Sequence, residues 1–297
     1  MNPVLKRTLA GLSVGALVIG LFVCAPLWTV LPILLVLSTL VQLEFYQMAK
    51  ACEPVTWFGL LMGGAWLTAV GLVGFGPMTA ALALGFPVFL VAAFFLLCLF
   101  VLFRSRYARP VESLASTLFG FLYVPFLVGF FLLMAQLGGE SILDGERSRT
   151  GLFTLFALIA VTKFSDTGGF AFGMAFGKHK MCPSISPKKS WEGLCGSMLF
   201  SAVVACLFLC LAQRFDWAAD VPLWGRLSYP LAAAGGAVVA LVATAGDLVE
   251  SRIKRACGVK DSATFMPAGM GGFLDMFDSI LFLPALVYPI LIATESL

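Results

Sequence analysis

The sequence predicts an all-α integral membrane protein that crosses the bilayer many times. Of its 297 residues, 60% are hydrophobic and only 12% are charged, whereas a soluble domain carries about 25% charged residues. Apolar runs of about 20 residues, the length that a spanning helix requires, recur from one end of the chain to the other. A transmembrane β-barrel would instead show alternating segments of about ten residues.

Nine spanning helices are predicted. The first run follows Lys6 and Arg7 and could be a signal peptide, but it has no clear cleavage site and a second apolar run follows at once, so we interpret it as a span. No linker divides the chain, which predicts a single membrane domain over 1–297. The spans are 9–25, 27–48, 56–76, 80–103, 113–137, 151–172, 193–213, 229–246 and 271–293.

The distribution of Lys and Arg predicts the orientation. With the N-terminus in the cytoplasm, the inner segments hold 15 of the 19 basic residues and the outer segments hold 4, which is the usual excess of positive charge inside. The polar loops 163–192 and 247–270 then face the cytoplasm, where nucleotides are. Because the bases are spread over membrane-flanking loops, the net charge of +3 does not indicate nucleic-acid binding.

Residues 247–278 form the most informative polar segment. Positions spaced by three and four residues share one face of a helix, and here that face presents Asp247, Glu250, Ser251 and Lys254. Further bases follow at Arg255 and Lys260, and cations of this kind bind phosphates. Gly269, Gly271 and Gly272 allow the backbone to approach a ligand closely and to offer N–H groups at a helix start.

Asp275 and Asp278 lie near the start of the last apolar run, 271–293, and their i, i+3 spacing places both on one helix face. A carboxylate costs about 2.5–3.5 kcal/mol at the centre of a spanning helix and less near its end. Two like charges that close repel each other unless a cation lies between them, and carboxylate oxygens suit Mg²⁺. We therefore predict that Asp247, Asp275 and Asp278 bind Mg²⁺, and we leave open a second cation. Asp261 is a further hard oxygen ligand.

The loop 163–192 is the second polar segment. Asp166 ends an apolar run and precedes Gly168 and Gly169, and an acid at membrane depth indicates function. The loop lysines could be interfacial anchors, and Trp191 could belong to the aromatic belt. Three other polar residues are interpreted as having no functional role. They are a lone loop histidine and two acids at helix boundaries, namely His179, Glu44 and Glu112.

These motifs resemble the signature of phosphatidate cytidylyltransferases, the CDP-diacylglycerol synthases. The similarity covers about 160–280, which we expect to be the catalytic half, and the rest of the chain agrees only in hydropathy. The matching segments are Asp166-x-Gly168, Gly173-x3-Phe176-Gly177-Lys178, Ser186-Pro187-Lys188-Lys189-Ser190-Trp191-Glu192-Gly193, Gly246-Asp247-Leu248-x-Glu250-Ser251-x-x-Lys254-Arg255, Lys260-Asp261, Pro267, Gly271-Gly272, Asp275 and Asp278-Ser279. The family usually has His where this chain has Met270, and Arg where it has Met276.

The resemblance implies a bacterial-type inner-membrane enzyme that uses CTP, phosphatidate and Mg²⁺, with its active site facing the cytoplasm. The sequence leaves open whether the protein forms a homodimer. A CTP-dependent polyprenol or lipid kinase is the first alternative, and an ion-coupled secondary transporter is the second. We expect catalysis from Asp247, Lys254, Asp261, Asp275 and Asp278, and substrate binding from Asp166, Lys188, Lys189, Ser251, Arg255, Lys260, Gly271 and Gly272.

Overall fold

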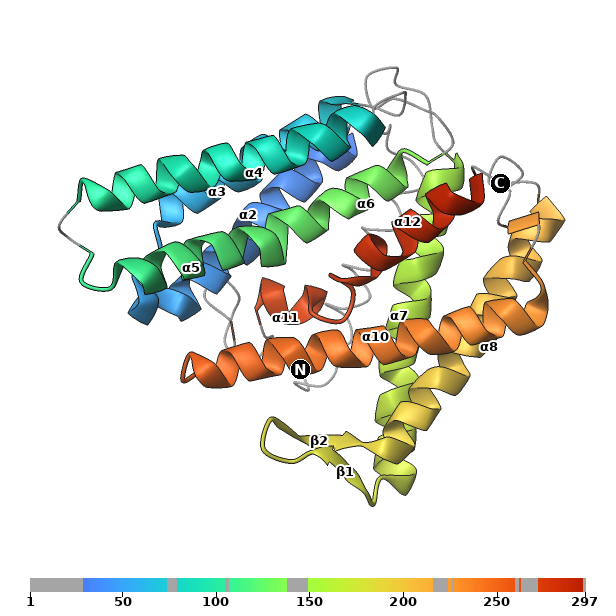
Figure 1. Ribbon diagram of the computed structural model, residues 1–297. Helices are drawn as coiled ribbons and strands as arrows, with labels where there is room; N and C mark the ends of the chain where they lie inside the picture. The colour runs from blue at the N-terminus through green and yellow to red at the C-terminus, as the bar shows by residue number, and fades with distance from the viewer. Residues whose placement is uncertain are drawn as a thin grey trace, which may run out of the picture.

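The computed structural model describes residues 29–73, 79–104, 107–137, 149–215, 224–225, 227–259, 262 and 272–295, which are mostly α-helical (Figure 1). Among these residues, six helices are long and apolar enough to cross a membrane, and two further apolar helices are shorter. The prediction of a polytopic α-helical membrane protein is confirmed. The finer prediction of nine spans is not settled, because the first, 9–25, lies outside the described residues.

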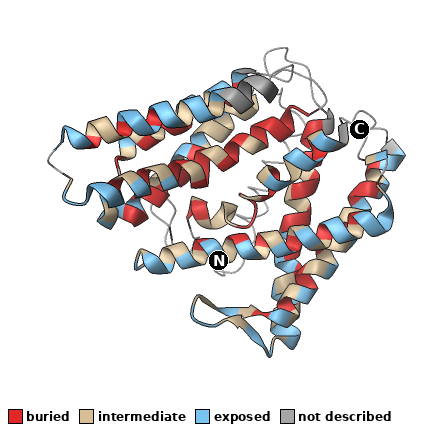
Figure 2. Cartoon of the chain, viewed as in Figure 1, coloured by how far each residue is buried: buried red, intermediate tan, exposed pale blue. Residues whose placement is uncertain are grey.

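The N-terminal bundle consists of α2 to α6. Its helices are α2 (Val30–Met48), which continues into the 3₁₀ turn η2 (Ala49–Cys52), α3 (Thr56–Val73), α4 (Thr79–Leu102), and a long helix made of α5 (Pro110–Phe121), the π-helical turn η3 (Leu122–Phe126) and α6 (Leu127–Ala135). Pro125 lies within η3 and has no N–H to donate, which accounts for the irregular turn. Large side chains fill the core, including Trp66 against Phe86, and α6 is buried almost throughout (Figure 2).

The C-terminal group consists of α7 (Arg149–Phe176), α8 (Trp191–Phe215) and α10 (Tyr229–Ala256), with α10 lying across the other two in Figure 1. Small residues bring α7 and α8 into close contact: a Cβ added to Gly168 would lie 2.6 Å from the Gly196 carbonyl oxygen. The hydroxyl of Ser197 donates a hydrogen bond to the carbonyl of Ser165 at 2.9 Å and fastens the pair. The backbones themselves therefore form this interface.

A β-hairpin that the sequence analysis did not predict joins α7 to α8. Its antiparallel strands are β1 (Lys180–Cys182) and β2 (Ser186–Ser190), with Lys180 opposite Ser190 and Cys182 opposite Ser186. The base is closed by Glu192, whose carboxylate accepts the His179 backbone N–H at 3.2 Å and contacts its Nδ1 at 2.6 Å. The lone histidine thus has a partner in the first turn of α8.

The final predicted span, 271–293, is not one helix. It is divided into α11 (Phe273–Phe277), a turn over 278–282 and α12 (Leu283–Glu295). The Asp278 carboxylate accepts a hydrogen bond from the Ser279 backbone N–H, and such local bonds compete with the helical ladder. Pro284 cannot donate to that ladder but fits the first turn of a new helix. The sequence analysis missed this break because the segments on both sides of the turn are apolar.

Candidate active site

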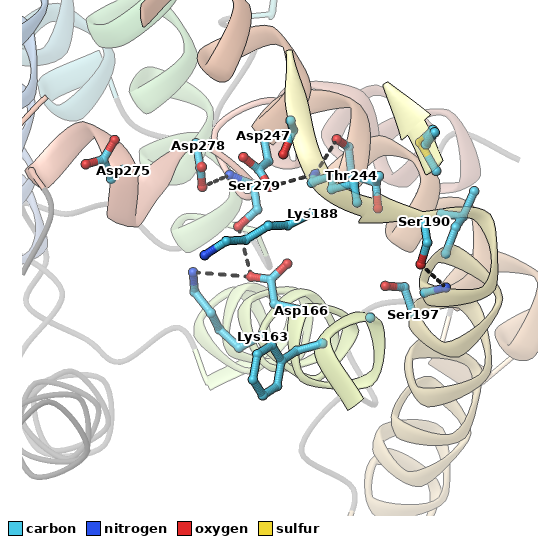
Figure 3. Close-up of a pocket in the computed structure, with 17 residues that line it drawn as sticks. Lys163, Asp166, Lys188, Ser190, Ser197, Thr244, Asp247, Asp275, Asp278 and Ser279 are labelled. Atoms are coloured by element: carbon cyan, nitrogen blue, oxygen red, sulfur yellow. Dashed lines mark hydrogen bonds and ion pairs between the residues drawn. The ribbon is translucent and has the colours of Figure 1, made fainter. Parts of the chain in front are cut away.

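A cavity of about 420 Å³ lies where α7, the hairpin, α8, α10 and the turn after α11 meet (Figure 3). Polar side chains from all these segments except α8 carry its charge, and α8 contributes Gly193, Leu194 and Ser197 to the wall. Of the residues predicted to act in catalysis or binding, the cavity brings together Asp166, Lys188, Lys189, Asp247, Asp275 and Asp278. Other polar residues that line it include Lys163, Thr244 and Ser279.

Close contact between α10 and the turn positions two of the acids. A Cβ on Gly246 would lie 2.6 Å from the carbonyl oxygen of Asp278, so only glycine fits there without displacing the turn. The next residue of α10 is Asp247, which is therefore held beside Asp278. This explains why a glycine precedes the aspartate in that motif.

Three carboxylates form an acidic trio, defined as Asp247, Glu250 and Asp278. One oxygen from each lies within 4.8 Å of the others. Glu250 is fully buried, and its Oε1 has no hydrogen-bond partner among the described residues. Asp247 and Asp278 are half-buried beside the buried Glu250, and hard oxygen donors gathered in this way suit a divalent cation such as Mg²⁺.

Asp275, predicted as a metal ligand, has other partners in this structure. Its Oδ1 lies 2.7 Å from Lys254 Nζ, and its Oδ2 accepts the Gly272 backbone N–H at 2.8 Å. Lys254 Nζ also lies 2.7 Å from Glu250 Oε2, as an ion pair without hydrogen-bond geometry. Lys254 thereby links Asp275 to the trio.

The hairpin brings a lysine to the other side of the trio. Lys189 Nζ lies 2.6 Å from Asp247 Oδ2 and donates a hydrogen bond to the Thr244 carbonyl at 3.1 Å. Its side chain is only 21% exposed, whereas Lys188 is exposed at the cavity rim. The two lysines of the motif therefore have different environments, and only Lys189 contacts an acid of the trio.

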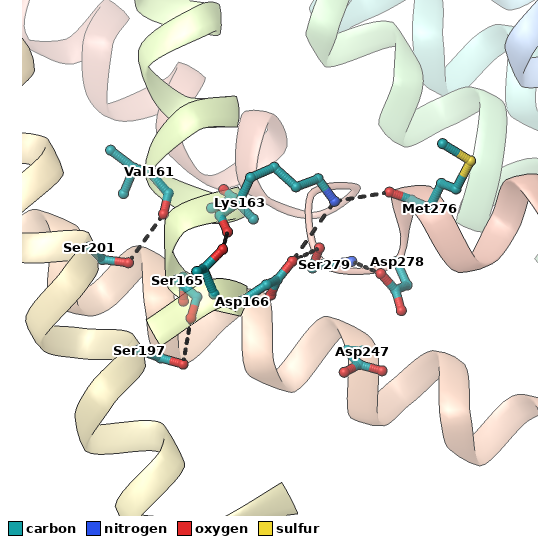
Figure 4. A network of polar contacts seen from close by, with 12 residues as sticks. Val161, Lys163, Ser165, Asp166, Ser197, Ser201, Asp247, Met276, Asp278 and Ser279 are labelled. Atoms are coloured by element: carbon teal, nitrogen blue, oxygen red, sulfur yellow. Dashed lines mark hydrogen bonds and ion pairs between the residues drawn. The ribbon is translucent and has the colours of Figure 1, made fainter. Parts of the chain in front are cut away.

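Asp166 reaches the cavity from α7 (Figure 4). Its Oδ2 accepts a hydrogen bond from the Ser279 hydroxyl at 3.3 Å and lies 3.8 Å from Lys163 Nζ. Lys163 in turn donates to the Met276 carbonyl at 3.2 Å. Through these contacts α7 holds the turn that follows α11, and about half of the Asp166 side chain remains open to solvent.

The other residues predicted to bind substrate or to act in catalysis either do not line the cavity or lie outside the described residues. Ser251 donates to Asp247 Oδ1 at 3.4 Å, and Gly272 is the residue before α11. Arg255 is exposed and donates to the Val259 carbonyl. Lys260, Asp261 and Gly271 lie outside the described residues.

Sequence reasoning missed several groups that lie at or near the cavity. Glu250 was placed on the correct helix face but was not selected as a ligand. Glu44 was interpreted as a boundary residue, yet it is fully buried and its Oε2 accepts the Leu274 backbone N–H at 2.9 Å. The buried Tyr123 hydroxyl has no hydrogen-bond partner among the described residues. No local pattern could connect the N-terminal bundle to residues so far along the chain.

Several membrane-spanning helices, with acids and lysines gathered at one cavity, are features of a membrane enzyme that handles phosphate-bearing substrates. The comparison with known proteins then gives the family. The chain matches the Cytidylyltransferase family over residues 5–293 and belongs to it. The resemblance seen in the motifs is thereby confirmed, and the chain is a nucleotidyltransferase.

Individual relatives agree with this assignment. The chain is 30% identical over 296 residues to a phosphatidate cytidylyltransferase of Mycobacterium bovis, covering 91% of this chain and 82% of that protein. A protein of the same name from Chlamydia trachomatis is 32% identical over 199 residues, covering 66% and 61% of the two chains. One from Staphylococcus saprophyticus is 37% identical over 140 residues, covering 47% and 49%.

Proposed function

We propose that this protein transfers the cytidylyl group of CTP to phosphatidate, giving CDP-diacylglycerol and pyrophosphate. The observation that carries the proposal is the cavity, which gathers Asp166, Lys189, Asp247 and Asp278 from segments far apart in the sequence. These residues belong to the motifs that resemble the family. The chain acts as a single membrane domain over 1–297, with its catalytic half at about 160–280.

The reaction is a displacement at phosphorus. An oxygen of the phosphatidate phosphate forms a bond to the α-phosphorus of CTP, and the bond from that phosphorus to the bridging oxygen breaks and releases pyrophosphate. The attacking phosphate is already mostly ionised near neutral pH, so a strong general base is not needed. The difficulty is to bring two polyanions together, and catalysis of this kind depends on positioning and electrostatics.

Cationic side chains at the cavity reduce that repulsion. Lys189 and Lys188 reach it from the hairpin, and Lys163 reaches it from α7. Lys163 donates to the carbonyl of Met276, the position where the family usually has arginine. We propose that Lys163 supplies the positive charge that the family's arginine would supply at position 276.

The acidic trio would hold Mg²⁺, which supplies charge neutralisation to the triphosphate when bound. Asp275 remains a candidate ligand that would first have to leave Lys254. A second cation stays open. Asp247 and Glu250 come from the rigid helix α10, whereas Asp278 comes from the turn, so the geometry depends on where that turn lies.

The active site would face the cytoplasm of a bacterial-type inner membrane. The 15:4 distribution of basic residues supports this orientation. A cysteine introduced at Lys180, in the hairpin, should react with a membrane-impermeant thiol reagent only after the membrane is opened. Reaction with reagent added outside intact cells would reverse the orientation.

One assay tests the function. Purified protein with CTP, phosphatidate and Mg²⁺ should release pyrophosphate and yield a lipid with the mass of CDP-diacylglycerol. A phosphorylated lipid together with CDP would indicate a CTP-dependent lipid kinase instead. Solute uptake into proteoliposomes without CTP turnover would indicate a transporter.

A further inference from the structure

Glu44 is a buried acid in the N-terminal bundle. It lies near the end of α2, has no exposed surface, and would be costly at that depth without a partner. Its partner is the backbone of α11, because Oε2 accepts the Leu274 N–H at 2.9 Å. Leu274 is fully buried as well, so water does not compete for this bond.

The bond matters because α11 cannot hold its own position. A helix of five residues is far below the length that is stable in isolation, and its first N–H groups have no partner within the helix. Asp275 accepts the N–H of Gly272 from inside the same segment. Glu44 accepts the N–H of Leu274 from a different part of the fold, and a carboxyl group is favoured at that helix end.

The approach of Glu44 to α11 is tight. A Cβ added to Gly272 would lie 2.6 Å from Glu44 Oε2, so α11 cannot slide along α2 without a clash or a lost hydrogen bond. Asp278 directly follows α11 as its C-cap residue. The position of α11 therefore fixes how far Asp278 lies from Asp247 and Glu250 on α10.

We propose that Glu44 is a positioning residue for the acidic trio: by binding the start of α11, the N-terminal bundle sets the place of Asp278. Glu44 does not touch substrate in this role. The catalytic consequence of the proposal rests on the proposed function, but the structural part does not.

Hydrogen–deuterium exchange tests the structural part directly. In Glu44→Met the acceptor is lost, and the backbone amides of residues 273–278 should exchange about tenfold faster or more. The matched control is Gln42→Met, which removes a buried polar group of the same helix that bonds the Gly59 carbonyl and not α11. In the control, exchange over 273–278 should equal that of the unchanged protein. Unchanged exchange in Glu44→Met would overturn the proposal.

Kinetics test the consequence. Glu44→Met should lower kcat by about tenfold and raise the Mg²⁺ concentration needed for half-maximal rate, while the KM for CTP changes less. Glu44→Gln keeps an oxygen acceptor and should restore most of the rate. If faster exchange leaves kcat and the Mg²⁺ requirement unchanged, α11 does not position the trio and the proposal fails.

Two safeguards keep the outcomes distinct. If Glu44→Met does not fold, Glu44→Asp provides the test, because it keeps the carboxyl group but withdraws it from Leu274 and should speed exchange at α11 to a smaller degree. If the unchanged protein releases no pyrophosphate, the proposed function fails, and the exchange experiment still decides whether Glu44 holds α11.

Discussion

The two halves of the molecule use glycine differently. In the N-terminal bundle, a Cβ added to Gly71 would meet the side chain of Leu31, and one added to Gly129 would meet the indole of Trp66. In the C-terminal group, a Cβ on Gly236 would meet the Ser201 carbonyl oxygen, and one on Gly246 would meet that of Asp278. Side chains can rotate away from an added methyl group, whereas a helix backbone cannot.

This difference indicates what each half contributes. Large side chains separate the helices of the bundle, so its spacing tolerates small adjustments. Backbone contact fixes the spacing in the C-terminal group, and the acids and lysines of the cavity stand on those helices and their connections. Misplacement of a reacting group by about 1 Å can cost a hundredfold in rate, so the tighter construction lies where the chemistry is proposed.

The largest expected effect comes from the trio. Asp278→Asn and Asp247→Asn should each lower pyrophosphate release about a hundredfold or more, because the ligand charge that would hold the cation is lost. Glu112→Gln in the N-terminal bundle is the control, since Glu112 is exposed and, among the residues that the structure describes, forms an ion pair only with Arg109 at the surface. Wild-type rate and Mg²⁺ dependence in either Asn variant would contradict the proposed site.

A smaller effect is expected from the hairpin. Lys189→Ala should lower kcat/KM by about 30-fold, because the lost cation contacts Asp247 inside the cavity. Lys188→Ala should change kcat/KM by about threefold at most, as for an exposed charge. Steady-state kinetics with CTP and phosphatidate varied in turn measure both. Equal losses in the two variants would show that contact with the trio does not matter.

The smallest effect tests the glycine comparison itself. Gly246→Ala should push the turn away from α10, lowering kcat about tenfold and stability by about 1–3 kcal/mol. Gly71→Ala should cost less, because Leu31 can move. Gly235→Ala provides the baseline: its Cβ meets nothing within 4 Å, so alanine should stabilise the helix by up to about 1 kcal/mol. Thermal unfolding in detergent ranks the three, and similar losses at Gly246 and Gly71 would remove the distinction.

Much of the fold was predictable because each spanning helix requires a long apolar run that is easily recognised in the sequence. The helices α2 to α8 lie close to their predicted spans, whereas α10 continues ten residues beyond the end of its predicted span, 229–246. The break after Phe277 was not predictable from hydropathy, because the segments on both sides of it are apolar. The hairpin was missed for the opposite reason: strands of three and five residues in a lysine-rich loop carry no alternating pattern.

Some residues of the candidate site could likewise be predicted from the sequence, and others could not. Asp166, Lys189, Asp247 and Asp278 were selected from motifs, and the structure places them together at one cavity. Asp275 was assigned to the metal by helical spacing, but Lys254 and the start of α11 hold it in this structure. Glu44 was out of reach of any sequence pattern, since its partner lies 230 positions away.

The division of the last apolar segment has a consequence for the surrounding lipid. A helix of 13 residues such as α12 is about 20 Å long, and the hydrocarbon layer of a bilayer is about 30 Å thick. If the far end of α12 reaches the opposite surface, the acidic turn lies about 10 Å below the level of the glycerol groups on its own side. Thinning of the adjoining leaflet is one way in which a bilayer accommodates such a short segment. The thickness of the host membrane would thereby set how far a lipid phosphate has to descend to reach Asp278.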